Sequence, residues 1–280
     1  MKLGFNLLLW TTHVTDEHAP IFELLKANGY DGVEVPVMEG PVEHYEKLGR
    51  LIRSAGLECT SSTALPGPQA NPISDDPAIH NAGLDYLKRC IDSVAALGST
   101  VLCGPTYQTL GQFTGSGPTD DERQRIVEVH RAAADHAATC GVTLATEPLN
   151  RFECYFLNTL ADAAEHTRAV DRPNFGVLFD TFHANIEEQD MLASVRRHGD
   201  VVRHVHLSEN DRGIPGTGHV DFPGVIKTLR EVDYDGWLVV EAFGRALPSL
   251  AAATCVWRDL FDSPEQVVEQ SASMIRAWLA

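Results

Sequence analysis

Short apolar runs alternate with longer amphipathic segments along the whole chain. The short runs are rich in Val, Leu, Ile, Phe or Thr and are bounded by Gly, Pro, Asn or Asp, which is typical of β-strands. They cover residues 3–10, 32–36, 57–62, 100–104, 142–147, 175–180, 201–207 and 237–241. Continuously apolar strands need cover on both faces, so the alternation predicts a parallel sheet with helices outside it.

The segments between the runs have helical periodicity and recognisable ends. They cover residues 16–30, 75–99, 119–141, 159–170, 187–200, 221–236 and 263–280. Gly29, Gly98 and Gly141 are helix stop signals, and Thr119 before an acidic first turn is a start signal. Eight strand-like runs that alternate with helical segments in 280 residues predict an α/β fold, a single (β/α)8 TIM barrel over residues 1–280. An open doubly wound sheet is disfavoured, and no glycine-rich nucleotide fingerprint follows the first run.

The last four strand-like runs end in side chains that can bind metal ions. Glu147 ends "LATE", Asp180 ends "VLFD" and Glu241 ends "LVVE". In "RHVHL", His204 and His206 point to the same face, and His206 is nearer the strand end. Active-site groups of (β/α)8 barrels stand at the carboxyl ends of strands. We therefore predict that Glu147, Asp180, His206 and Glu241 share one rim, and interpret His204 as a barrel-core histidine.

Three carboxylates at one rim predict a divalent cation between them. Crowded carboxylates repel one another and raise each other's pKa, and a cation removes that cost. An oxygen-rich set with one imidazole suits Mn²⁺, with Co²⁺ or Mg²⁺ as alternatives, better than structural zinc. A lone strand-end carboxylate is more often a helix cap or a salt-bridge partner. Four such positions in succession favour the metal site.

The charge and the cysteines limit the class of partner and the compartment. The formal net charge is −17, and no Lys/Arg-rich run is present, which disfavours nucleic acid and anionic membranes as partners. No apolar run approaches the ~20 residues of a membrane span, and no signal peptide is predicted. The six cysteines are scattered without a C-x-x-C motif, which favours reduced thiols in the cytoplasm. We expect a cytoplasmic protein that acts on a small molecule.

The motifs of the carboxyl-terminal half resemble those of a known family. "EPLNRFE", "DTFHANIEE", "HVHLSENDRG" and "VVEAF" are similar to motifs of the ketose 3-epimerases (D-tagatose, D-psicose (allulose) and L-ribulose 3-epimerases) of the xylose-isomerase-like TIM barrel superfamily. The resemblance extends over the whole chain, but its N-terminal motifs are vague. Pro148 and Ala242 depart from the family pattern without touching a ligand position.

The resemblance implies roles for individual residues. It implies that the metal ligands are Glu147, Asp180, His206 and Glu241, and that Glu147 and Glu241 also serve as acid and base. It implies that Glu153, His183 and Arg212 hold the O1–O2 end of a sugar, and that the protein forms a homodimer or homotetramer. The implied activity is metal-dependent epimerisation of a ketose at C3 through a cis-enediolate, with the two glutamates on opposite faces of the substrate.

Three other functions stay open at this point. An aldose–ketose or hydroxypyruvate-type isomerase of the same superfamily would use the same metal ligands. An endonuclease IV-like hydrolase is disfavoured by the acidic charge, and a catalytically inactive sugar-binding barrel by the intact ligand set. The identity of the sugar is open, as is its phosphorylation; Arg245 is a candidate phosphate ligand but is more simply explained by a surface ion pair.

Overall fold

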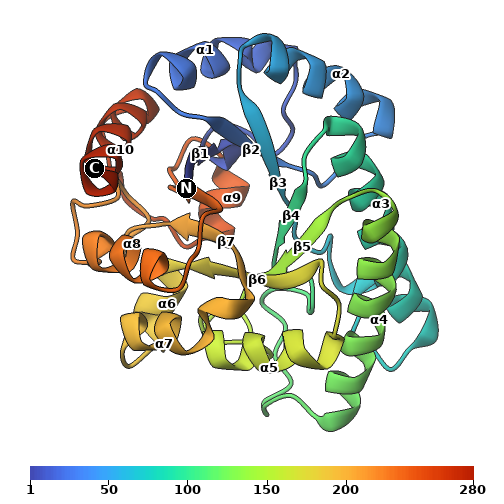
Figure 1. Ribbon diagram of the computed structural model, residues 1–280. Coiled ribbons are helices and arrows are strands. Elements are labelled where there is room, and N and C mark those ends of the chain that lie inside the picture. Colours follow the sequence, from blue (N-terminus) through green and yellow to red (C-terminus); the bar gives the residue numbers. More distant parts are fainter.

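The structure, a computed structural model that describes residues 1–280, is a barrel of parallel strands surrounded by helices (Figure 1). The strands are β1 (Lys2–Asn6), β2 (Gly32–Pro36), β3 (Glu58–Ser62), β4 (Val101–Gly104), β5 (Thr143–Thr146), β6 (Phe175–Asp180), β7 (Val202–Leu207) and β8 (Trp237–Val240). They are hydrogen-bonded in chain order, and β1 pairs with β8 to close the barrel. The predicted fold class is confirmed.

In Figure 1 the helices surround the strands as an outer ring, except for the short α9, which is seen inside this ring. They are α1 (Ala19–Ala27), α2 (Val42–Ser54), α3 (Pro77–Leu97), α4 (Asp120–Thr139), α5 (Leu160–Val170), α6 (Thr181–Glu187), α7 (Met191–His198), α8 (Phe222–Glu231), α9 (Pro248–Ala253) and α10 (Pro264–Leu279). Four 3-10 turns complete the set: η1 (Leu7–Leu9), η2 (Asp16–His18), η3 (Pro68–Ala70) and η4 (Gly199–Val201). None of these helices is both long and apolar enough to cross a membrane.

The helix ends follow the signals in the sequence. The Thr119 hydroxyl accepts a hydrogen bond from the Glu122 N–H at 3.3 Å, and the Glu122 carboxylate accepts one from the Thr119 N–H at 2.7 Å. This capping box satisfies backbone donors that the first turn of α4 leaves free. Gly98 ends α3 with φ of +85°, a left-handed conformation that glycine adopts without steric cost.

The structure differs most from the expected elements in the first strand and in the helices, where the short α6 and α9 were missed together with α2. The first strand ends at Asn6 instead of residue 10, because the Asn6 side chain accepts a hydrogen bond from the Leu8 N–H at 2.8 Å and starts the turn η1. Helix α2 was not among the predicted helical ranges. Charged residues and Gly49 interrupt its apolar stripe, so the helical pattern is weak in the sequence. Gly49 nevertheless has a packing role, because it lets α2 approach α3 closely: a side chain there would collide with the Leu97 carbonyl.

Most of the apolar core lies between the barrel and the helices, where 63 buried residues form one cluster. A smaller cluster made of Val101, Cys103, Ala145 and Leu178 belongs to β4, β5 and β6. Asn6, Glu34, Thr60 and His204, on β1, β2, β3 and β7, are polar and almost completely buried. The barrel therefore has polar side chains in its interior, and these need partners.

Candidate metal centre

The four strand-end side chains predicted as metal ligands come together at one end of the barrel. Asp180 and His206 lie in the last residues of β6 and β7, and Glu147 and Glu241 directly follow β5 and β8. Single ligand atoms of Glu147, Asp180 and His206 lie within 4.8 Å of one another. His206 Nδ1 is 3.3 Å from Glu241 Oε1 and 3.6 Å from Asp180 Oδ2. All four side chains are buried.

This arrangement fits a divalent cation. Asp180 Oδ2 and His206 Nδ1 are both buried and make no hydrogen bond. Burial, followed by the negative charges of Asp180 and Glu241, raises the pKa of Glu147 well above its ordinary value. Unpaired buried acceptors beside crowded carboxylates are costly unless a cation lies among them. Because most of the donor atoms are carboxylate oxygens, the set suits Mn²⁺ or Mg²⁺ better than a structural zinc ion.

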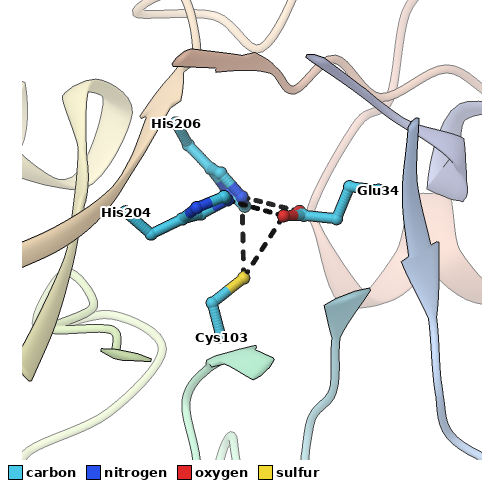
Figure 2. A group of neighbouring side chains, drawn as sticks. All are labelled: Glu34, Cys103, His204 and His206. Atoms are coloured by element: carbon cyan, nitrogen blue, oxygen red, sulfur yellow. Dashed lines mark hydrogen bonds and ion pairs between the residues drawn. The ribbon is translucent and has the colours of Figure 1, made fainter. Parts of the chain in front are cut away.

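A further carboxylate, the buried Glu34 on β2, supports this centre, and it was not among the residues predicted from the sequence. Figure 2 shows its carboxylate facing the imidazoles of both His204 and His206. Each imidazole Nε2 lies 2.7 Å from one of the two Glu34 oxygens. Asn6 Nδ2 and Thr60 Oγ1 each donate to the same carboxylate at 2.9 Å. Although burial would raise it, the neighbouring His206 and His204 hold the pKa of Glu34 well below its ordinary value.

The Glu34 contacts determine which nitrogen of His206 is free. An ionised carboxylate only accepts hydrogen bonds, so His206 Nε2 carries the proton that points at Glu34. Although burial lowers it, the charges of Glu34 and Glu241 raise the pKa of His206 well above its ordinary value. A cation that replaces the second proton would meet the Nδ1 lone pair, which faces Asp180 and Glu241 as a metal ligand requires. The signal for Glu34 was present in "GVEVP", where a charged residue occupies the middle of a strand that is buried at every position.

Three further residues that the sequence singled out adjoin the centre. Arg212 is buried; its Nη1 donates to Glu241 at 3.0 Å and its Nη2 lies 3.3 Å from both Glu153 Oε1 and His183 Nε2. The guanidinium stacks between the Phe182 and Phe243 rings, 3.9 and 4.8 Å from their centroids. Its charge is therefore held in place by aromatic faces as well as by carboxylates.

His183 is neutral in this setting and is oriented by the backbone. Burial, followed by the positive charge of Arg212, lowers the pKa of His183 to about 3. Its Nδ1 accepts a hydrogen bond from the Asn150 N–H at 3.0 Å, so its Nε2 carries the proton. That Nε2 is 3.7 Å from Glu147 Oε1 and 3.3 Å from an Arg212 nitrogen, which is also a donor. The N–H groups of His183 and Arg212 therefore lie next to each other, and no acceptor of the protein lies between them.

Two other arginines lie outside this group. Arg151, from the same motif as Glu147 and Glu153, binds Glu187 at 2.9 Å with 61 % of its side chain exposed. Arg245 forms the surface ion pair that was favoured for it, at 2.7 Å from Asp259. His204 is the buried barrel histidine expected, with Glu34 as its partner.

Comparison with known proteins places these features in a family. The family model described as "Xylose isomerase-like TIM barrel" matches residues 22–278. A ketose 3-epimerase of Arthrobacter globiformis is 32 % identical over 280 residues, which cover 99 % of this chain and 96 % of the relative. An L-ribulose 3-epimerase of Methylomonas sp. (strain DH-1) is 32 % identical over 250 residues, or 89 % of this chain and 87 % of the relative.

A solved structure of a 3-epimerase also has a closely similar fold. The crystal structure of a D-allulose 3-epimerase from Methylomonas sp. in complex with D-allulose matches with a TM-score of 0.92 and 30 % identity. The match covers 99 % of this chain and 96 % of that one.

Proposed function

Because the chain belongs to the ketose 3-epimerases of the xylose isomerase-like TIM barrel family, we propose that it inverts the configuration of a ketose at C3 with a divalent metal ion. The observation that supports this most directly is the pair Glu147 and Glu241, buried in one site with Asp180 and His206. An inversion needs an acid/base group on each face of the substrate, and this site offers a carboxylate from β5 and another from β8.

We propose Glu147, Asp180, His206 and Glu241 as the metal ligands and Mn²⁺ as the ion. When bound, such an ion would polarise the C2 carbonyl and stabilise the charge that develops on its oxygen. Glu34 would act as a positioning residue, because its contact with Nε2 of His206 leaves the opposite nitrogen for the metal.

The proton transfers are assigned to the two glutamates. The hydrogen on C3 is acidic only because the carbonyl is adjacent, so its removal gives a cis-enediolate. One of Glu147 and Glu241 would start as the carboxylate and take this proton, and the other would start as the carboxylic acid and give its own proton to the opposite face of C3. The assignment of acid and base is reversed for the reverse reaction, as an equilibrium between two epimers requires.

His183, Arg212 and Glu153 would bind the O1–O2 end of the sugar. A substrate oxygen beside His183 Nε2 and the Arg212 guanidinium would supply the acceptor that these adjacent donors lack. Glu153 Oε1 accepts from Asn150 at 2.8 Å and lies 3.3 Å from Arg212, and its partly exposed carboxylate could also accept from a hydroxyl. Stacking of Arg212 between two rings would keep its geometry fixed before the substrate arrives.

The isomerase alternative would use the same metal ligands. It differs because it needs an acid/base group on only one face of the substrate. The relatives favour epimerisation, since the two described above are a ketose 3-epimerase and an L-ribulose 3-epimerase. We also favour a free ketose over a phosphorylated one, because Arg245 is already engaged by Asp259. A phosphate would need a cationic partner of this kind at the far end of the sugar.

A substrate panel tests the proposal. Purified protein with Mn²⁺ is incubated with several free ketoses and their phosphorylated counterparts, and the products are separated by chromatography. We expect C3 epimers of a free ketose, loss of turnover after chelation, and recovery on addition of Mn²⁺. Aldose products would favour the isomerase, and metal-loaded protein without turnover on any ketose would favour the sugar-binding barrel.

A further inference from the structure

A second group of metal-ligating side chains lies on the outer wall of the barrel, between α3 and α4. Asp92 belongs to the last part of α3, His136 to the last part of α4, and Cys140 directly follows α4. These helix ends lead into β4 and β5, so the group lies toward the amino-terminal face of the barrel. The candidate metal centre lies at the opposite face, where the strands end.

The three side chains converge across the two helices. His136 Nε2 is 2.7 Å from Asp92 Oδ1, and one ligand atom each of Asp92, His136 and Cys140 lies within 4.8 Å of the other two. His136 and Cys140 are four residues apart, which places them on one face of a helix. Cys140 retains a near-helical backbone, with φ of −105° and ψ of −1°, so this relation extends past the last turn.

The group is open to solvent and can adjust to an ion. The side chains of Asp92 and His136 are 46 % and 31 % exposed, and Cys140 is exposed. A His–Asp ion pair alone would explain two of these residues but not the thiol beside them. The carbonyls at the end of α4 add partial negative charge at the same place, which favours a cation.

We propose that Asp92, His136 and Cys140 form a surface site for Zn²⁺. Thiolate, imidazole and carboxylate are the ligand types that zinc accepts, whereas Mg²⁺ and Ca²⁺ prefer oxygen ligands only. Three protein ligands leave a fourth position for water. The bound ion would link α3 to α4 on the outside of the barrel, and the site is independent of the chemistry proposed for the rim.

The second exposed thiol of the chain offers an internal control. Cys255 is exposed like Cys140, but its only polar contact is the Ala252 carbonyl at 3.9 Å. The Mn²⁺-loaded protein is alkylated with iodoacetamide with and without Zn²⁺, and the rate at each cysteine is read by mass spectrometry of its peptides. Because the free thiolate is the nucleophile, we expect Zn²⁺ to slow alkylation of Cys140 about tenfold and to leave Cys255 unchanged. Mg²⁺ in place of Zn²⁺ should protect neither.

Two substitutions then test the other ligands. In Asp92→Asn and in His136→Gln, the ratio of Cys140 rates with and without Zn²⁺ should move toward one. Both positions are partly exposed, so the variants should fold, which circular dichroism checks. Equal rates in the native protein, equal protection of both cysteines, or protection that survives both substitutions would each overturn the site. None of these readouts depends on epimerase activity.

Discussion

The two halves of the barrel contribute differently to the candidate metal centre. Strands β5 to β8 end in the reactive side chains, with one ligand-type residue at the end of each strand. Strands β1 to β3 instead provide three buried side chains, Asn6, Glu34 and Thr60, and the first and last of these donate to the Glu34 carboxylate. Glu34 then contacts His204 and His206 of β7, so one half bears the reacting groups and the other half orients them.

This difference shows that the two kinds of ligand need different support from the rest of the barrel. A rim carboxylate can reach a metal or a substrate by itself, but an imidazole needs a partner that determines which nitrogen is protonated. Asn6 connects the halves a second time, with its Nδ2 at 2.9 Å from Glu34 and 3.4 Å from Glu241. Substitutions in the two halves should therefore impair different properties of the protein.

Loss of an acid/base group in the carboxyl-terminal half should have the largest effect. We expect Glu147→Gln and Glu241→Gln each to lower turnover about 10²–10⁴-fold, because a glutamine cannot exchange the C3 proton. The measurement is epimer formation together with uptake of solvent deuterium at C3, in samples of known Mn²⁺ content. Asp180→Asn is the matched control, since it alters a proposed ligand that has no acid/base role. Near-full activity in either glutamine variant would exclude the two-base scheme.

Loss of the supporting carboxylate in the amino-terminal half should instead weaken the binding of the metal ion. We expect Glu34→Gln to reduce the affinity for Mn²⁺ about 10–100-fold, since the amide no longer selects one tautomer of His206. Calorimetric titration measures the affinity, and thermal unfolding checks the fold. Thr60→Val removes only one donor to Glu34 and should cost less affinity. Unchanged Mn²⁺ binding in Glu34→Gln would mean that the two halves are not coupled in this way.

A conservative change at Arg212 should have an intermediate effect. Lysine keeps the charge but lacks the planar group that stacks on Phe182 and Phe243 and donates to Glu241. We expect Arg212→Lys to lower kcat/KM about tenfold, which is the order expected for one charged hydrogen bond. Mn²⁺ affinity should change much less than in Glu34→Gln, and the opposite ranking would place Arg212 with the supporting residues.

The smallest effect is expected at Arg151, which follows β5 in the same loop as Glu153. Its exposed guanidinium binds the nearly buried carboxylate of Glu187, which is not one of the proposed metal ligands. Arg151→Lys should leave kcat/KM and Mn²⁺ affinity unchanged and the midpoint of thermal unfolding nearly so. A loss of activity comparable to that of Arg212→Lys would show that the loop, and not the guanidinium near Glu241, determines substrate binding.

The sequence predicted the strand ends well and the helices less completely. Its ranges for β2 and β6 agree with the structure residue for residue, because buried strands bounded by turn residues have a clear local pattern. Helix α2 was missed because charged residues surround its apolar stripe and its central glycine serves a contact with α3. The roles of the metal-binding and sugar-binding residues stay predictions that the experiments above address.

By itself the sequence determined the alternation of strands and helices, the rim to which each strand end belongs, and the types of ligand at that rim. These depend on local periodicity and on the rule that parallel strands end on one side. Only the tertiary structure decided that Glu34 holds His204, a residue 170 positions away, and that Arg212 stacks between Phe182 and Phe243. Such contacts arise when the barrel closes and brings non-adjacent strands and loops together, and no local pattern encodes which of them will meet.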